Sequence, residues 1–340
     1  MEKHSQPVQS GVALLRSLLL ANRLATYAWI VLAYTILVIL WGAFVRATGS
    51  GAGCGSHWPT CNGDVIPRPE SIETIIEFSH RLTSGLLGPM VIALVIWAWR
   101  KHGFRHRVTK GSIWTFIFVL IEGGIGAGLV LLELVADNPS SARAVWMGAH
   151  LINTLILLAI TTATAYWAAG GPAFRLQNNR SVARMLSVGL FLLLIVGAFG
   201  AITALGDTLF PAESFLEGAS AKFDPESHFS VRARLWHPTI AVGTVVYLVV
   251  IFWTTETFWA TATRSWWTKL NIALLGVQIL GGIVNVLLAA PVWMQLVHLL
   301  LADLSWIALI ILGIESLATA EVNVAHAEQT AELPNFSTGD

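Results

Sequence analysis

The chain has 340 residues, of which 55% are apolar and only 12% are charged, whereas soluble domains carry about 25% charged residues. This composition predicts an integral membrane protein surrounded by lipid. The net charge is zero, so the chain offers no basic surface for nucleic acid and no acidic tail for a cationic partner.

Eight apolar segments follow one another along the chain, and each is long enough to cross a bilayer. Backbone groups in lipid must form hydrogen bonds within their own segment, so each segment is expected to be a helix. The first segment lacks the short apolar core and cleavage site of a signal peptide and is expected to stay in the protein. The predicted fold is an all-α integral membrane protein with eight transmembrane helices, at residues 27–45, 75–99, 112–134, 144–168, 184–205, 233–254, 270–290 and 293–315.

Positive charge is distributed unequally between the connections. The N-terminal segment and the loops at 100–110, 175–184 and 264–269 together hold 13 of the 20 Lys and Arg residues. Cytoplasmic loops of membrane proteins are enriched in Lys and Arg. We therefore expect a multi-pass protein of the plasma (inner) membrane, with both termini in the cytoplasm and the loop of Cys54 and Cys61 at the outer face.

An internal repeat divides the chain into two halves. GAFVRATGSG (42–51) matches GAFGAITALG (197–206), and Glu122 of the third segment aligns with Gln278 of the seventh. Four helices per half insert both halves in the same sense, which predicts two tandem four-helix bundles related by a pseudo-two-fold axis along the membrane normal. The expected division is a cytoplasmic N-terminal segment (1–26), an N-terminal bundle (27–170), a cytoplasmic linker (171–183), a C-terminal bundle (184–317) and a disordered cytoplasmic tail (318–340).

Four of the ten histidines lie inside apolar segments, each near the start of an even-numbered helix: His80, His150, His237 and His298. At about 1.5 Å per residue, each lies about 24 to 29 Å from the cytoplasmic end of its helix. All four are therefore expected at one depth, toward the outer face.

Two imidazoles that converge from two helices of one bundle are the ligands of six-coordinate haem iron. This pattern predicts one pair per half, His80 with His150 and His237 with His298. Zinc is the competing metal, but two histidines without a cysteine or carboxylate at ligand spacing make a poor closed zinc site. A single buried histidine is more often a hydrogen-bonded core residue, and the repetition argues against that interpretation here.

Taken together, VRATGSGAGCGSHWPTCNG (45–63), EFSHR (77–81), eight helices in two repeats and four histidines on the even helices resemble the haem A synthase family. The resemblance covers nearly the whole chain. It implies oxidation of the C8 methyl group of haem O to a formyl group, which gives haem A for terminal oxidases. It also implies a cofactor haem b between His237 and His298, substrate haem O near His80 and His150, and Glu77 as the catalytic carboxylate. The implied partners are a haem O synthase as donor of haem O and a terminal oxidase as recipient of haem A.

Cys54 and Cys61 are the only cysteines. Their loop is expected in an oxidising compartment, where such a pair usually forms a disulfide, and they match the first-loop pair of the bacterial family. Many relatives also carry a second pair between helices 5 and 6, which residues 207–234 lack. Two roles stay open for the pair: a structural link that holds a cover over the N-terminal site, or a redox role.

Other polar residues near the histidines admit two interpretations. Glu77 lies one turn before His80 and either acts in chemistry or only pairs with Arg81. Mid-membrane carboxylates must be paired, neutral or in a polar pocket, and for Glu122 and Asp303 we expect a structural hydrogen bond. Four arginines at the outer boundary either bind haem propionates or mark helix ends: Arg46, Arg81, Arg232 and Arg234.

Two other functions compete with this family's enzymatic activity. One is a dihaem b-type membrane cytochrome that only transfers electrons; the other is a transporter built on the repeat. The transporter is disfavoured because the polar residues gather at one face and not at the midplane. The cytochrome is disfavoured because Glu77 precedes His80 where Arg234 precedes His237, which predicts that the two sites do different work.

Overall fold

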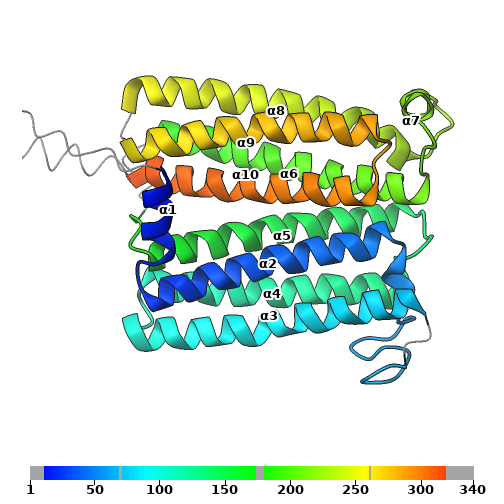
Figure 1. Ribbon diagram of the computed structural model, residues 1–340, viewed down its shortest axis with the longest axis horizontal. Coiled ribbons are helices and arrows are strands. Elements are labelled where there is room, and N and C mark those ends of the chain that lie inside the picture. Colours follow the sequence, from blue (N-terminus) through cyan, green and yellow to red (C-terminus); the bar gives the residue numbers. More distant parts are fainter. Residues whose placement is uncertain (1–10, 69–70, 174–179, 260–261, 319–340) are drawn as a thin grey trace, which may run out of the picture.

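The computed structural model describes residues 11–68, 71–173, 180–259 and 262–318 (Figure 1). Within these ranges the regular secondary structure is helical, apart from one isolated bridge between Cys61 and Asp64 in a loop. The long helices are α2 (Arg23–Ala47), α3 (Ile72–His102), α4 (Arg107–Leu131), α5 (Ser141–Ala168), α6 (Arg180–Leu209), α8 (Phe229–Trp259), α9 (Ala262–Leu287) and α10 (Val292–Ala318). The short ones are α1 (Gly11–Leu19), the 3-10 turn η1 (Ser50–Ala52) and α7 (Phe215–Ala221).

Eight helices of the described chain are long and apolar enough to cross a membrane. They coincide with the eight predicted segments, so the prediction of an all-α, multi-pass membrane protein is confirmed. The third and seventh helices end at Leu131 and Leu287, about three residues earlier than predicted. Left-handed backbone explains both ends, because Glu133 has φ 55° and Ala289 has φ 58°, a conformation that does not continue a helix.

Two short helices, α1 and α7, were not predicted. They lie in the segment before α2 and in the loop between α6 and α8, where no long apolar run marks a helix. The predicted disordered tail beyond Ala318 and the middle of the predicted linker, at 174–179, lie outside the described residues.

The long helices pack with their axes nearly parallel (Figure 1). Helix α2 contacts α3 and α5, and α4 contacts the same two helices. Among the later helices, α8 contacts α6 and α9, and α10 contacts α9 and α6. Helices α5 and α10 lie in the middle of the molecule, where α10 also packs against α5 and α2. Leu32, Leu155, Leu158 and Trp306 form a buried apolar cluster at this contact.

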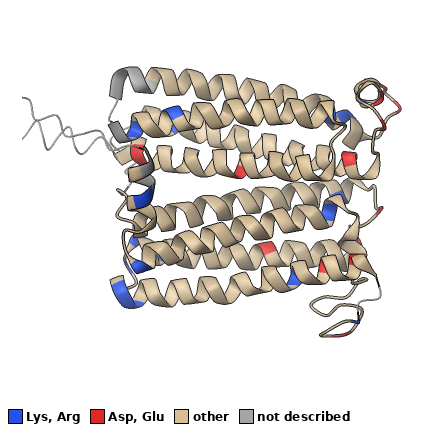
Figure 2. Ribbon diagram, in the orientation of Figure 1, with Lys and Arg blue, Asp and Glu red and all other residues tan. Residues whose placement is uncertain are grey.

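The molecule has two distinct ends. Helix α1 lies at one end, and the loop of Cys54 and Cys61 lies with α7 at the other, which we call the disulfide end (Figure 1). Charged residues gather at both ends and are sparse between them (Figure 2). Large apolar side chains cover the outside of the helices; Leu37, Leu82 and Val246, for example, each expose more than half of their surface. Such a surface suits contact with lipid.

Helix caps locate several of the boundaries. The Asn22 side chain accepts a hydrogen bond from Ala25 N and donates to Ala168 O at 2.8 Å, so it begins α2 and holds it to the end of α5. Ser71 accepts from Thr74 N at the start of α3. Such caps satisfy backbone donors that a helix leaves free in its first turn.

Candidate functional site

His237 of α8 and His298 of α10 face each other at the disulfide end of the later helices. Their ring centroids are 6.4 Å apart and their planes are at 89°. An imidazole nitrogen binds a transition metal at about 2 Å, so two rings on opposite sides of one metal atom have centroids roughly 6 Å apart. The spacing therefore fits a metal atom between the rings, as in a haem with two histidine ligands.

The backbone fixes the orientation of His237. Its Nδ1 lies 3.1 Å from Val196 O, so Nδ1 carries the proton and donates to that carbonyl. Nε2 is then left with a lone pair for a metal. A Cβ at Gly200 would lie 3.0 Å from His237 Cε1, and one at Gly282 would lie 3.1 Å from His298 Cε1. Glycine at both positions gives each imidazole its space.

A second histidine pair lies in the earlier helices. His80 lies in α3 and His150 lies in α5. Gly42 of α2 faces His80, where a Cβ would approach its Cε1 to 2.9 Å. His150 differs from the other three because a carboxylate touches it: Glu122 Oε1 lies 3.1 Å from His150 Nδ1.

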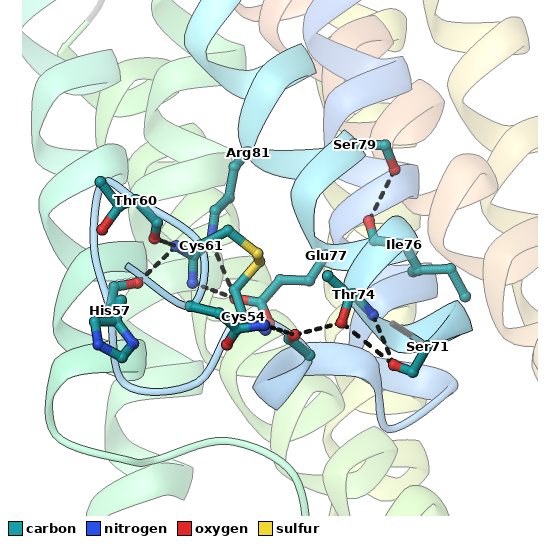
Figure 3. Close-up of a disulfide and its surroundings, with 12 residues drawn as sticks. Cys54, His57, Thr60, Cys61, Ser71, Thr74, Ile76, Glu77, Ser79 and Arg81 are labelled. Carbon is teal, nitrogen blue, oxygen red and sulfur yellow. Dashed lines mark hydrogen bonds and ion pairs between the residues drawn. A yellow bond between two sulfur atoms is a disulfide. The ribbon is translucent and has the colours of Figure 1, made fainter. Parts of the chain in front are cut away.

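Glu77 is buried, with 4% of its surface exposed, although it lies in the second turn of α3. Its Oε2 accepts from Cys54 N at 2.8 Å, and its Oε1 accepts from Arg81 Nε at 3.1 Å and Nη2 at 2.5 Å. Figure 3 shows this carboxylate between the disulfide loop and Arg81. The carboxylate is thus fixed in direction one helical turn from His80.

A disulfide joins Cys54 and Cys61. Both cysteines are fully buried, and Asn62 N donates to Cys54 O across the closed loop. Gly53 lies so close to α3 that a Cβ there would collide with the Glu73 backbone. Thr74 Oγ1 also donates to Gly53 O at 2.7 Å. The loop is therefore docked on the first turn of α3, with the Cys54 amide aimed at Glu77 (Figure 3).

The four arginines at the disulfide end have different surroundings. Arg46 donates to Ala204 O, Thr208 Oγ1 and Gln295 Oε1. Arg81 is held by Glu77 and by the carbonyls of His57 and Thr60, and Arg234 is held by Asp207 at 2.7 Å.

Arg232 is exposed, and its side chain forms no hydrogen bond or ion pair with the described residues. It lines a cleft of about 380 Å³ with Phe199, Ile202, Phe229, Ala233 and Trp236. Among the four arginines, Arg232 is the one whose guanidinium is open to a carboxylate ligand.

The two mid-membrane carboxylates also differ. Glu122 accepts hydrogen bonds from Asn153 Nδ2 and Thr154 Oγ1, which links α4 to α5 as expected for a structural bond. Asp303 is fully buried, and neither of its oxygens has a hydrogen-bond partner among the described residues, so the structural hydrogen bond expected for Asp303 is not found.

Sequence reasoning missed several residues of the site. The carbonyl of Val196 carries no sequence signal, because it depends on how α6 packs against α8. Asp207, which pairs with Arg234, stands in a stretch where its partner cannot be read from spacing. Gly42, Gly200 and Gly282 were visible as small residues in apolar helices, but their contact with histidines depends on helix rotation.

The fold and the site define a multi-pass helical membrane protein with two histidine pairs, one of which has the spacing of two ligands on one metal. Residues 25–310 match the model of the family COX15-CtaA, described as cytochrome oxidase assembly protein. The chain belongs to this family.

Curated relatives carry two different names. "Protoheme IX farnesyltransferase" of Thermus thermophilus is 47% identical over 277 residues, which cover 82% of this chain and 46% of that protein. "Heme A synthase" of Halalkalibacterium halodurans is 31% identical over 270 residues, which cover 77% of this chain and 87% of that protein. "Heme A synthase" of Alkalihalophilus pseudofirmus is 29% identical over 285 residues, which cover 82% of this chain and 92% of that protein. The chain thus spans about half the length of the Thermus relative but nearly the whole of the other two.

Proposed function

We propose that this chain is a haem A synthase, an oxidoreductase that converts the C8 methyl group of haem O to a formyl group and so supplies haem A for terminal oxidases. The observation that carries the proposal is the difference between the two histidine sites. A buried carboxylate, Glu77, stands one turn before His80, whereas Arg234, paired with Asp207, stands one turn before His237. The relatives named Heme A synthase support the same activity.

We assign a resident haem b to His237 and His298 and the substrate haem O to His80 and His150. The 6.4 Å separation of the His237 and His298 ring centroids supports the first assignment. For the second, His80 lies beside the glycine of α2 much as His237 lies beside the glycine of α6. His237 and His298 would hold the resident haem, which would supply electron transfer to the site of His80 and His150.

Glu77 has the catalytic role in this proposal. Oxidation of a methyl group removes electrons and protons together, so a group that accepts a proton or stabilises positive charge beside the methyl lowers the barrier. Cys54 N and Arg81 fix the direction of the Glu77 carboxylate, and the docked loop covers it from solvent. Arg232, whose guanidinium is open, is the arginine best suited to bind a propionate.

The two sites fit an architecture of two halves, residues 27–170 and 184–317, related by a pseudo-two-fold axis along the membrane normal. Glu122 touches His150 and its repeat partner Gln278 touches His298. Gly42 faces His80 and Gly200 faces His237. Gly42 and Gly200 are 158 residues apart, whereas the sequence match pairs Gly42 with Gly197, about one helical turn earlier. The glycines that are equivalent in packing are therefore not the ones that the sequence match aligns.

The proposed location is the plasma membrane, with both termini in the cytoplasm and the disulfide end outside. The excess of Lys and Arg in the loops at the α1 end supports this orientation. A disulfide at the other end agrees with an oxidising compartment there.

We further propose that haem O reaches the chain from a haem O synthase. The Thermus relative is named for transfer of a farnesyl group to protohaem, and it is about twice as long as the part that this chain matches. A region like this chain therefore occurs within a protein named for the chemistry that would make the substrate. The recipient of haem A would be a terminal oxidase.

The test is to express the chain together with a haem O synthase and to identify the extracted haems by chromatography and mass. We expect haem A beside haem b, and haem A should be absent when the chain is omitted. An extract that holds only haem O and haem b would refute the activity, and two unchanged b haems per chain would identify a dihaem cytochrome.

A further inference from the structure

Repeat-equivalent residues touch repeat-equivalent histidines in the two halves, but they differ in charge and in the ring nitrogen that they approach. In the first half Glu122 Oε1 of α4 lies 3.1 Å from His150 Nδ1. In the second half Gln278 Nε2 of α9 lies 3.4 Å from His298 Nε2. The first histidine therefore has a carboxylate beside it, and the second has a neutral amide.

The Glu122 carboxylate is held in place on both oxygens. Oε2 accepts from Asn153 Nδ2, and Oε1 accepts from Thr154 Oγ1 in addition to its contact with His150. Asn153 also donates to Phe118 O at 3.1 Å, which fixes the amide itself. Three side chains of α5 thus converge on one carboxylate of α4, with Asn153 and Thr154 on different oxygens, and neither of these two bonds needs a charge.

We infer that Glu122 is a positioning residue for the haem of the first half. Its carboxylate lies beside His150 Nδ1, which leaves Nε2 for iron, and it makes His150 a stronger electron donor than His298. This inference rests on the proposed function, because it takes His150 to be a haem ligand. A carboxylate that accepts the second N–H of a metal-bound imidazole fixes its tautomer and raises its basicity.

A measurable difference between the two sites follows. A more basic axial ligand stabilises ferric iron over ferrous iron, so Glu122 lowers the midpoint potential of the first-half haem. Gln278, being neutral, has no such effect on the second-half haem. Loss of such an outer partner typically weakens metal binding about 10- to 100-fold.

The test uses the purified full chain with haem b in place and with added haem O, and it follows potentiometric titrations by visible absorption. Glu122→Gln keeps the size of the side chain. Its one carbonyl oxygen can accept from Asn153 Nδ2 while its amide group donates to Thr154 Oγ1, so the charge is removed and a link between α4 and α5 remains. We expect one of the two midpoint potentials to rise and the other to stay, with haem O binding weakened about 10-fold or more. Glu133→Gln, at an exposed carboxylate just past α4, is the matched control and should change neither.

A second variant, Glu122→Asp, keeps the charge but draws it away from His150 Nδ1, so the same midpoint potential should rise by a smaller amount. If Glu122→Gln is poorly produced, this variant decides alone, and an unchanged potential there would overturn the inference. Unchanged potentials and haem O affinity in Glu122→Gln would likewise show that Glu122 only links two helices. This test does not depend on the proposed activity. With protohaem bound as the probe in both sites, the shift in midpoint potential is measurable even if the wild-type chain makes no haem A.

Discussion

At the scale of single residues, Glu77 and Arg81 form one unit with the loop that covers them. Arg81 Nη1 donates to the carbonyls of His57 and Thr60 at 2.6 Å each, while its Nε and Nη2 hold Glu77. The guanidinium therefore has little capacity left for a propionate. The ion-pair interpretation of Glu77 and the catalytic one are compatible, because a fixed direction is what a catalytic carboxylate needs.

The first prediction concerns Glu77→Gln. We expect haem content and the visible spectrum to be retained, because the proposed iron ligands are the histidines, while the formyl product falls by at least about 100-fold, as for loss of a general base. The measurement is the chromatographic haem profile at matched protein levels, with accumulation of a hydroxylated intermediate as a further sign. Glu73→Gln, at an exposed carboxylate one turn earlier, is the control and should give a normal profile. A normal yield of haem A in Glu77→Gln would reduce Glu77 to a partner of Arg81.

At the scale of elements, the loop between α2 and α3 covers Glu77 and is held in place by several contacts. The disulfide closes residues 54–61, Gly53 lies against the backbone of α3, and Thr74 binds Gly53 O. These contacts direct the Cys54 amide at Glu77. The geometry thus favours the structural role of the cysteine pair, because the bridge shapes the segment that donates to the carboxylate.

The second prediction is that the double variant Cys54→Ala, Cys61→Ala keeps its haems and makes less haem A, but still a measurable amount. A bridge that closes so short a loop contributes about 2 to 3 kcal/mol, so the thermal midpoint should also fall. Haem profiles and thermal unfolding of the purified protein check both expectations. Complete loss of product in a folded, haem-loaded double variant would instead favour a redox role of the pair.

At the scale of the whole molecule, bonds at three depths join the earlier helices to the later ones. At the disulfide end Arg46 of α2 reaches α6 and α10. In the middle Trp306 Nε1 of α10 donates to Leu155 O of α5 at 2.7 Å. At the α1 end Tyr166 Oη of α5 donates to Glu315 Oε1 of α10 at 2.5 Å. The contact between the halves is therefore fixed along its length, which keeps the two histidine pairs at a constant separation.

Features of the fold and of the site that depend on local sequence could be predicted, and features that depend on contacts between distant residues could not. The spans follow from local composition, because lipid imposes helices on any apolar segment of that length. His80, His150, His237 and His298 stood out as polar residues in apolar segments, and their shared depth followed from helix rise. The fastening of the loop by Gly53 and Thr74, and the partners of Arg46, could not be read in the same way. They depend on which helix faces which, and residues up to 249 positions apart meet there.

The third prediction tests the bond at the disulfide end through Arg46→Met. Sequence reasoning placed Arg46 beside a haem, but its guanidinium joins three acceptors across the halves: Ala204 O, Thr208 Oγ1 and Gln295 Oε1. Hydrogen bonds to a charged group contribute about 1.5 to 3 kcal/mol each, and methionine fills similar space without satisfying any acceptor. We therefore expect a clear fall in the thermal midpoint, with the spectrum of the haem at His237 and His298 unchanged in the folded protein. Arg100→Met, at an exposed arginine in the last turn of α3, should leave the midpoint within error of wild type. If Arg46→Met instead kept its stability and lost haem, the guanidinium would be a propionate ligand, and the link between the halves would rest on Trp306 and Tyr166.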